Sequence, residues 1–228
     1  MSAEHSTQGP RKRRRGRRAP GRDHASGASG GGSRGAGARS KTSALKIPPL
    51  PGPMPDGPIA LVGLMGVGKT TVGRRLARRL GYAHFDSDHE IEAASGRTVA
   101  GYFRDHGEAD FRAGERRVIE RLLRENPRMV LSTGGGAFIP EDTRALLREA
   151  ATVVWLKGDF ETIMARVSRR NTRPLLMVDD PRAKMRELME ERHPLYAQAH
   201  ITVPIAKGPH MRTVNRVLKA LAEHAGRS

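Results

Sequence analysis

The segment Gly63–Thr70 constrains this chain more than any other stretch of its sequence. It reads GLMGVGKT and matches G-x-x-x-x-G-K-[ST], a loop whose glycines let successive backbone N–H groups converge on phosphate oxygens. Lys69 supplies a cation for the β- and γ-phosphates, and the Thr70 hydroxyl is a natural Mg²⁺ ligand. The apolar run 59–62 predicts a buried parallel strand before the loop, and residues 71–80 predict an amphipathic helix after it. The segment therefore predicts a site for a nucleoside triphosphate.

The positive charge of the chain is unevenly distributed. Residues 1–57 hold 12 Lys and Arg against three acidic side chains, which accounts for +9 of the net charge of +17. They contain the basic run 11–18, a Gly/Ala/Ser stretch and the proline-broken run 47–51, without apolar periodicity. Such a segment buries too little apolar surface to offset its ordering entropy. We therefore expect a disordered extension over residues 1–57, followed by one folded domain over 58–228.

Three interpretations of this extension stay open. Its charge favours loose, salt-sensitive contact with nucleic acid or another polyanion, although no aromatic residue is interleaved in residues 11–18 to stack on bases. It could also be a solvated tail without a role, or sequence upstream of a true start at Met54. Comparing residues 54–228 with the full chain separates these interpretations.

Composition also bears on location. The chain has no cysteine, which excludes disulfides and thiolate metal sites and favours an intracellular setting. No apolar run approaches the roughly 20 residues that span a bilayer. The first residues lack the apolar core of a secretory signal. These observations predict a cytoplasmic protein without membrane contact.

From residue 58 onward, apolar runs alternate with helical patterns, which indicates βαβ units and a parallel sheet. Further strands are expected at 83–85, 129–132, 152–156 and 201–203. Further helices are expected at 88–94, 108–125, 141–149, 159–168, 181–193 and 214–224. The Arg-rich stretch from 169 to 180 is expected to be a loop.

Polar residues follow the strands at the edge where ligands bind in an open parallel sheet. Asp86 and Asp88 follow the strand at 83–85, and in an extended segment they point to opposite sides. One carboxylate can then face Mg²⁺ and the nucleotide, and the other an acceptor. The alternative is that Asp88 simply caps the next helix. Gly134–Gly136 follows the strand at 129–132, as either a close backbone approach to a polar ligand or a flexible turn.

Phosphoryl transfer needs positioned oxygens and neutralised charge, and several arginines are candidates for this work. Arg112 stands one helical turn before Glu115, which can orient its guanidinium. Arg173 precedes Pro174-Leu175-Leu176, and Arg192 precedes His193-Pro194-Leu195-Tyr196. Taken singly, each of these arginines is more often a solvated surface charge.

In combination, residues 59 to about 197 resemble shikimate kinase, motif after motif and in order. The motifs are Gly63-x4-Gly68-Lys69-Thr70, Asp86-x-Asp88, Phe103-x3-Gly107-Glu108-x2-Phe111-Arg112-x2-Glu115, Thr133-Gly134-Gly135-Gly136-Ala137, Arg173-Pro174-Leu175-Leu176 and Arg192-x-Pro194-Leu195-Tyr196. The resemblance implies a three-layer α/β P-loop kinase, with a five-stranded parallel sheet in the order 2-3-1-4-5 and a mobile lid at about 166–180. It implies transfer of the ATP γ-phosphoryl group to the 3-hydroxyl of shikimate, on the route to chorismate and the aromatic amino acids, by a monomer.

The resemblance also implies roles for individual residues. Catalytic roles fall to Lys69, Asp88 and Arg173, the last on the lid. The residues implied for ATP are Gly63, Gly66, Val67, Gly68, Lys69, Thr70, Thr71, Arg166 against the adenine, and Arg173. Those implied for Mg²⁺ are Thr70 and Asp86. Those implied for shikimate are Asp88 at its hydroxyls, Arg112 and Arg192 at its carboxylate, and Gly134, Gly135 and Gly136 along the pocket, with Phe103 and Phe111 as an apolar wall.

Two departures and one competing enzyme class qualify this assignment. Ala199-His200 stands where the family usually has Ala-Asp, and residues 204–209, on the adenine side, do not align with the family pattern. A kinase for another hydroxylated substrate, such as gluconate, is the competing class. Gluconate kinases typically carry Asp-Gly-Asp with a nearby His, whereas Ser87 separates the acidic pair here.

Overall fold

Five parallel strands form one sheet in the computed structural model, which describes residues 48–168, 178–205 and 207–227. The strands are β1 (Ile59–Val62), β2 (Ala83–Asp86), β3 (Met129–Ser132), β4 (Thr152–Lys157) and β5 (Ile201–Pro204). Their order is β2-β3-β1-β4-β5, and every neighbouring pair is parallel. This confirms the predicted strand order and fold class.

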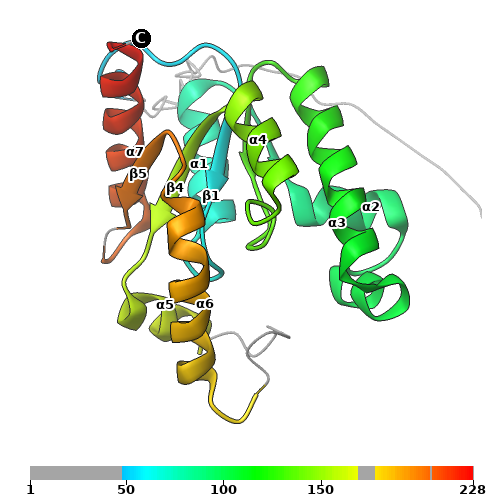
Figure 1. Ribbon diagram of the computed structural model, residues 1–228. Coiled ribbons are helices and arrows are strands. Elements are labelled where there is room, and N and C mark those ends of the chain that lie inside the picture. Colours follow the sequence, from blue (N-terminus) through cyan, green and yellow to red (C-terminus); the bar gives the residue numbers. More distant parts are fainter. Residues whose placement is uncertain (1–47, 169–177, 206, 228) are drawn as a thin grey trace, which may run out of the picture. The chain divides into compact units, whose positions relative to one another are not determined.

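The helices cover both faces of the sheet. They are α1 (Lys69–Leu80), α2 (Ser87–Ser95), α3 (Val99–Glu125), α4 (Glu141–Ala150), α5 (Phe160–Val167), α6 (Pro181–Tyr196) and α7 (His210–Ala225). The connection from β1 to β2 runs in the opposite direction to the later crossovers, so right-handed connections place α1 on the opposite face from α4. Figure 1 shows α7 beyond β5 at one end of the sheet, and α2 and α3 at the other.

The central strands are short apolar runs because both of their faces are covered. Every residue of β1 and β3 is buried, and Ile59, Leu61 and Leu131 are fully enclosed. Since the carboxyl ends of parallel strands share one edge, the loops after β1, β2 and β3 emerge side by side. This edge carries the candidate site.

Three helices extend beyond their predicted bounds by three residues or more. The helix predicted from 108 begins at Val99, where Thr98 caps it by accepting a hydrogen bond from the Gly101 N–H at 3.1 Å. The helix is kinked at Gly107, which has φ 80° and ψ 173°. The part before the kink was therefore not recognised as a continuation of the helix predicted from 108. The helix predicted to end at 193 continues through Pro194, and the last helix begins at His210 rather than at 214.

The described part of the predicted extension, residues 48–57, contacts the folded domain. The Arg79 guanidinium on α1 donates to the carbonyl oxygens of Pro48 and Pro49, at 3.1 and 3.4 Å. Met54 packs partly buried against the core. Residues 1–47, and residues 169–177 of the predicted lid with Arg173, lie outside the described residues. No helix among the described residues is long and apolar enough to cross a membrane.

A chain of two hydrogen bonds ties β2 and β3 to the start of α1. The Ser132 hydroxyl donates to the Lys69 carbonyl oxygen at 3.1 Å, and the same hydroxyl oxygen lies 3.1 Å from His84 Nε2. Because a hydroxyl has one proton, His84 Nε2 must be the donor to Ser132. Burial lowers the pKa of His84, with Arg74 acting in the same direction and Asp86 opposing it. His84 is therefore the neutral Nε2–H tautomer in the folded protein near neutral pH.

We predict that His84 makes stability depend on pH. Its pKa is lower when folded than its ordinary value of 6.5, so its contribution is complete above that value and is lost as pH falls through the folded pKa. His84→Gln keeps an N–H donor but does not titrate. Thermal denaturation from about pH 7.5 to about pH 5.5 should lower the melting temperature less in this variant than in the parent. Parallel curves for the two proteins would contradict the prediction.

Candidate active site

The phosphate-binding loop adopts the conformation that its glycines permit. Gly66 and Gly68 have φ of 82° and 96°, in the left-handed region where a side chain is strained. A Cβ at Gly66 would also stand 2.7 Å from Val167 Cγ2. The buried Lys69 folds back over the loop, and its Nζ donates to the carbonyl oxygens of Gly63 at 2.6 Å and Leu64 at 3.1 Å. The Lys69 cation is thus held against the loop, and its role toward phosphates stays a prediction.

Thr70 and Asp86 meet beside this loop. The Thr70 hydroxyl, at the first turn of α1, donates to Asp86 Oδ2 at 2.7 Å. These are hard oxygen donors next to a phosphate site, which is the type of ligand set that Mg²⁺ takes together with phosphate oxygens and water. The described residues contain no cluster of three or more side chains that could bind a metal without such help. The pair fits a Mg²⁺ ion carried by a nucleotide.

The prediction that Asp86 and Asp88 lie in an extended segment, and point to opposite sides for that reason, is wrong. The chain is not extended after Asp86, because α2 begins at Ser87 and Asp88 lies in its first turn. Asp86 caps the helix by accepting a hydrogen bond from the Asp88 N–H at 3.2 Å. The capping residue is therefore Asp86 rather than Asp88, and the helical turn directs the two carboxylates apart.

The triglycine after β3 makes room for functional side chains. A Cβ at Gly134 would lie 2.5 Å from Asp88 Oδ1 and 3.0 Å from Glu115 Oε1, and a Cβ at Gly136 would overlap the Arg112 guanidinium. The Gly134 N–H donates to the Ser87 hydroxyl oxygen at 2.8 Å. The segment is therefore a close backbone approach, and it brings α2, α3 and the end of β3 together.

Arg112 is held by two carboxylates on its own helix. Its Nη1 donates to Glu115 Oε2 at 2.6 Å, and its Nη2 lies 3.1 Å from Glu108 Oε1. Glu115 is buried, whereas the Glu108 side chain is 69% exposed. Burial raises the pKa of the Glu115 carboxyl, the Arg112 cation counters this, and the nearby Asp88 adds to the rise. The guanidinium also lies over the stacked rings of Phe103 and Phe111, 5.6 and 5.3 Å from their centroids, and their own centroids are 4.3 Å apart.

Arg192 reaches the same region from α6. Its side chain is mostly buried and lies beside the Tyr196 hydroxyl, which donates to the Gly135 carbonyl oxygen. Burial raises the pKa of Tyr196 to about 12, although Arg192 and Arg112 both act to lower it. Arg112 and Arg192 thus both lie close to Tyr196 and the triglycine, where two positive charges come together.

One cleft of about 410 Å³ extends from the phosphate-binding loop to Asp88 and the triglycine. Gly66, Gly68, Lys69, Thr70 and Thr71 line it on the loop side, and Asp86, Asp88 and Gly135 line the other side. Gly63 and Val67 do not line the cleft, and their carbonyl oxygens accept hydrogen bonds from Lys69 and Arg166. Arg112, Arg192, Gly134 and Gly136 do not line it directly but surround its end at Asp88 and Gly135. Arg173 lies outside the described residues.

The cleft also includes His210, which the sequence did not single out. Met65 and Thr133, members of the loop and of the triglycine motif, belong to its lining as well, and Arg166 donates to the Val67 carbonyl oxygen at 3.0 Å. A Cβ at Gly68 would meet the His210 ring at 3.0 Å and Arg166 at 3.7 Å. The turn at Gly208-Pro209 was the available signal, since it starts α7 and brings His210 to the loop.

The fold and this cleft define a P-loop kinase for a small molecule. A family model described as "Shikimate kinase" matches residues 65–222. The chain is 53% identical over 165 residues to a shikimate kinase of Caulobacter vibrioides, covering 72% of this chain and 82% of the relative. It is 42% identical to a shikimate kinase of Bartonella henselae, over 73% of this chain and 79% of the relative. The chain belongs to the shikimate kinase family.

Solved structures agree with this assignment. The shikimate kinase of Acinetobacter baumannii, in complex with shikimate, matches with a TM-score of 0.68 at 41% identity over 72% of this chain and 91% of its own. A gluconokinase of Sinorhizobium meliloti matches with a TM-score of 0.51 at 21% identity, over 75% of this chain and 95% of its own. The second likeness reflects the shared fold alone.

We predict that the two carboxylates on Arg112 differ in their contribution to stability. Glu115→Gln removes the charge from a buried partner at 2.6 Å and should lower the free energy of unfolding by about 1–3 kcal/mol. Glu108→Gln removes an exposed partner of the same guanidinium and should cost less than about 1 kcal/mol. Urea denaturation measures both. Equal losses would show that burial does not decide the strength of the pair.

Proposed function

We propose that this protein transfers the γ-phosphoryl group of ATP to the 3-hydroxyl of shikimate, forming shikimate 3-phosphate on the route to chorismate and the aromatic amino acids. One observation carries the proposal: Lys69 of the phosphate loop and Asp88 of α2 line a single cleft. A donor and an acceptor bound there meet between a cation and a carboxylate. Membership of the shikimate kinase family, and the relative described in complex with shikimate, support this acceptor.

The loop binds the donor. Its backbone N–H groups surround the β-phosphate, and Lys69 Nζ exchanges its carbonyl partners for phosphate oxygens. Thr70 and Asp86 would hold Mg²⁺, which would supply positive charge against the phosphates of the nucleotide. Arg166 and His210 lie at the far end of the cleft, where the base of the nucleotide fits.

The arginines bind the acceptor. A guanidinium presents a planar fork that matches a carboxylate, so Arg112 and Arg192 hold the shikimate carboxylate near Gly135 and Gly136. Glu115 positions Arg112 and keeps its charge partly balanced before substrate arrives. Phe103 and Phe111 supply the apolar wall on this side.

Asp88 orients the reacting hydroxyl. Its carboxylate accepts the hydrogen bond of the 3-hydroxyl and takes up its proton as the oxygen forms a bond to the γ-phosphorus. The bond from that phosphorus to the β,γ-bridging oxygen breaks, and ADP leaves. Charge builds on the transferred group, where Lys69 and Arg173 would stabilise it. We assign Arg173 to this role from the family motif, and we further propose that a cytoplasmic monomer is the active form.

The direct test supplies purified protein with ATP, Mg²⁺ and shikimate. We expect stoichiometric ADP and a phosphomonoester at the 3-position, identified by ³¹P and ¹H NMR. Gluconate serves as the competing acceptor. No ADP formation with shikimate, or faster turnover of gluconate than of shikimate, would overturn the proposal.

We predict that Lys69→Ala lowers kcat with shikimate by roughly 100- to 1,000-fold, because the transition state loses a preorganised cation. Steady-state kinetics at saturating substrates measures the change. Lys219→Ala, at an exposed position of α7, is the matched control and should keep the parent rate. A Lys69→Ala rate within threefold of the parent would exclude the role assigned to Lys69.

We predict that Arg112→Ala acts mainly on the acceptor. The carboxylate loses a charge-assisted, two-point partner, so KM for shikimate should rise roughly 10- to 100-fold while KM for ATP changes little. Arg124→Ala, an exposed position of the same helix, is the control. If KM for shikimate in Arg112→Ala matched the parent, the carboxylate assignment would fail.

A further inference from the structure

A second cavity, of about 500 Å³, lies between α2 and α3 and shares no lining residue with the phosphate-loop cleft. Its floor is apolar and includes Ile91 and Phe111, which are 4% and 2% exposed. The Tyr102 ring stands edge-on to Phe111, with centroids 5.9 Å apart, and is tilted against His106 at 4.7 Å. The cavity therefore offers aromatic surface to a flat apolar group.

The rim of this cavity is basic. Arg97, Arg117 and Arg121 line it together with His106, and no carboxylate belongs to the lining. Arg121 lies 3.8 Å from Glu90, which balances part of its charge. Arg117 forms no ion pair with any residue that the structure describes. Since Arg97 pairs with Asp105 at 2.7 Å and Arg121 lies beside Glu90, the net positive charge of the rim comes from Arg117.

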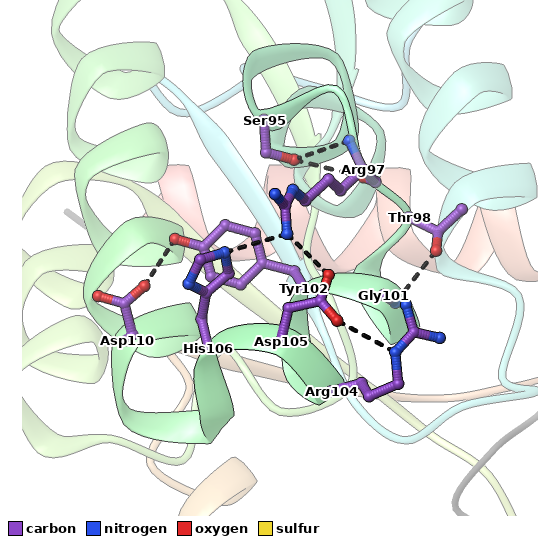
Figure 2. A network of polar contacts seen from close by, with 9 residues as sticks. All are labelled: Ser95, Arg97, Thr98, Gly101, Tyr102, Arg104, Asp105, His106 and Asp110. Atoms are coloured by element: carbon purple, nitrogen blue, oxygen red, sulfur yellow. Dashed lines mark hydrogen bonds and ion pairs between the residues drawn. The ribbon is translucent and has the colours of Figure 1, made fainter. Parts of the chain in front are cut away.

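A hydrogen-bond network fixes several of these side chains (Figure 2). Arg97 Nη1 donates to Asp105 Oδ2 at 2.7 Å and lies 3.2 Å from His106 Nε2. The Tyr102 hydroxyl donates to Asp110 at 2.8 Å, and Ser95 contacts the Arg97 backbone. Held in this way, Arg97 and the Tyr102 ring lose less freedom when a ligand binds.

Gly114 keeps the space above the floor open. The nearest groups to a Cβ at this position would be the Tyr102 hydroxyl at 3.9 Å and Arg117 Nη2 at 4.0 Å. A polar group and an unpaired guanidinium thus flank one glycine in the middle of α3. A ligand lying over Gly114 can contact both.

We propose that this cavity binds a small organic anion with a flat ring and one carboxylate. The ring packs on Phe111 and Tyr102, and the carboxylate pairs with the guanidinium of Arg117. Phe111 also packs against the Arg112 guanidinium at 5.3 Å, so a bound anion alters the affinity of the acceptor site. This second effect rests on the proposed function, whereas binding itself does not.

Benzoate is a suitable probe for binding. Because it could also occupy the acceptor site, calorimetric titration is done with that site filled by saturating shikimate and ADP. We expect one benzoate per chain, and benzamide, its neutral counterpart, should not bind. Arg117→Gln should weaken benzoate roughly tenfold or more. Gly114→Leu, which fills the cavity, should abolish binding, and Arg124→Gln, which removes an arginine of the same helix outside the cavity, should bind as the parent does.

Kinetics give an independent readout. Benzoate should change KM for shikimate in the parent and in Arg124→Gln, but less in Arg117→Gln, and without benzoate all three should share one kcat. No heat under saturating shikimate, or equal affinity in Arg117→Gln and the parent, would overturn the proposed site. A change in KM that is the same in Arg117→Gln would assign benzoate to the acceptor site instead. Failure of the proposed function would appear separately, as a lack of turnover without benzoate.

Discussion

The backbone turn between β1 and α1 is the constraint on which the rest of the structure depends. Gly66 and Gly68 hold left-handed conformations, and Val167 and His210 approach them where a side chain would stand. The turn points N–H groups and Lys69 into the cleft, and it requires α5 and α7 to pack closely around it. The sheet order then sets which other loops share its edge.

The proposed acceptor half of the site depends on a balance of buried charge. Arg112 is useful only if its guanidinium stays in place before substrate arrives, and Glu115 holds it there at 2.6 Å. Burying this pair carries a desolvation cost, which the close geometry and the partly exposed Glu108 contact offset. The triglycine makes this arrangement possible because it has no side chains. Asp88 and Arg112 occupy the space that side chains at Gly134 and Gly136 would need.

The features that could be predicted from the sequence are those that a short local pattern determines. Short hydrophobic segments located all five strands, and the glycines with Lys69 located the loop that lines the cleft, because each of these signals lies within one short segment. The first part of α3 was missed because its apolar positions, Val99, Tyr102 and Phe103, cover barely one turn before the helix kinks at Gly107. His210 was missed because α7 comes close to the loop only in the folded chain, far from it in sequence. The local geometry at Asp88 was predicted incorrectly, because a helix capped by Asp86 begins where an extended chain was expected.

The central claim is that one sheet edge holds both substrates, with the acceptor hydroxyl between Asp88 and the donor phosphates. A crystal structure of the protein with shikimate, ADP and Mg²⁺ tests it most directly. We expect the shikimate carboxylate against Arg112 and Arg192, its 3-hydroxyl on Asp88, and the ADP phosphates in the loop 63–70. Shikimate bound with its carboxylate toward Lys69, or outside the cleft, would contradict it.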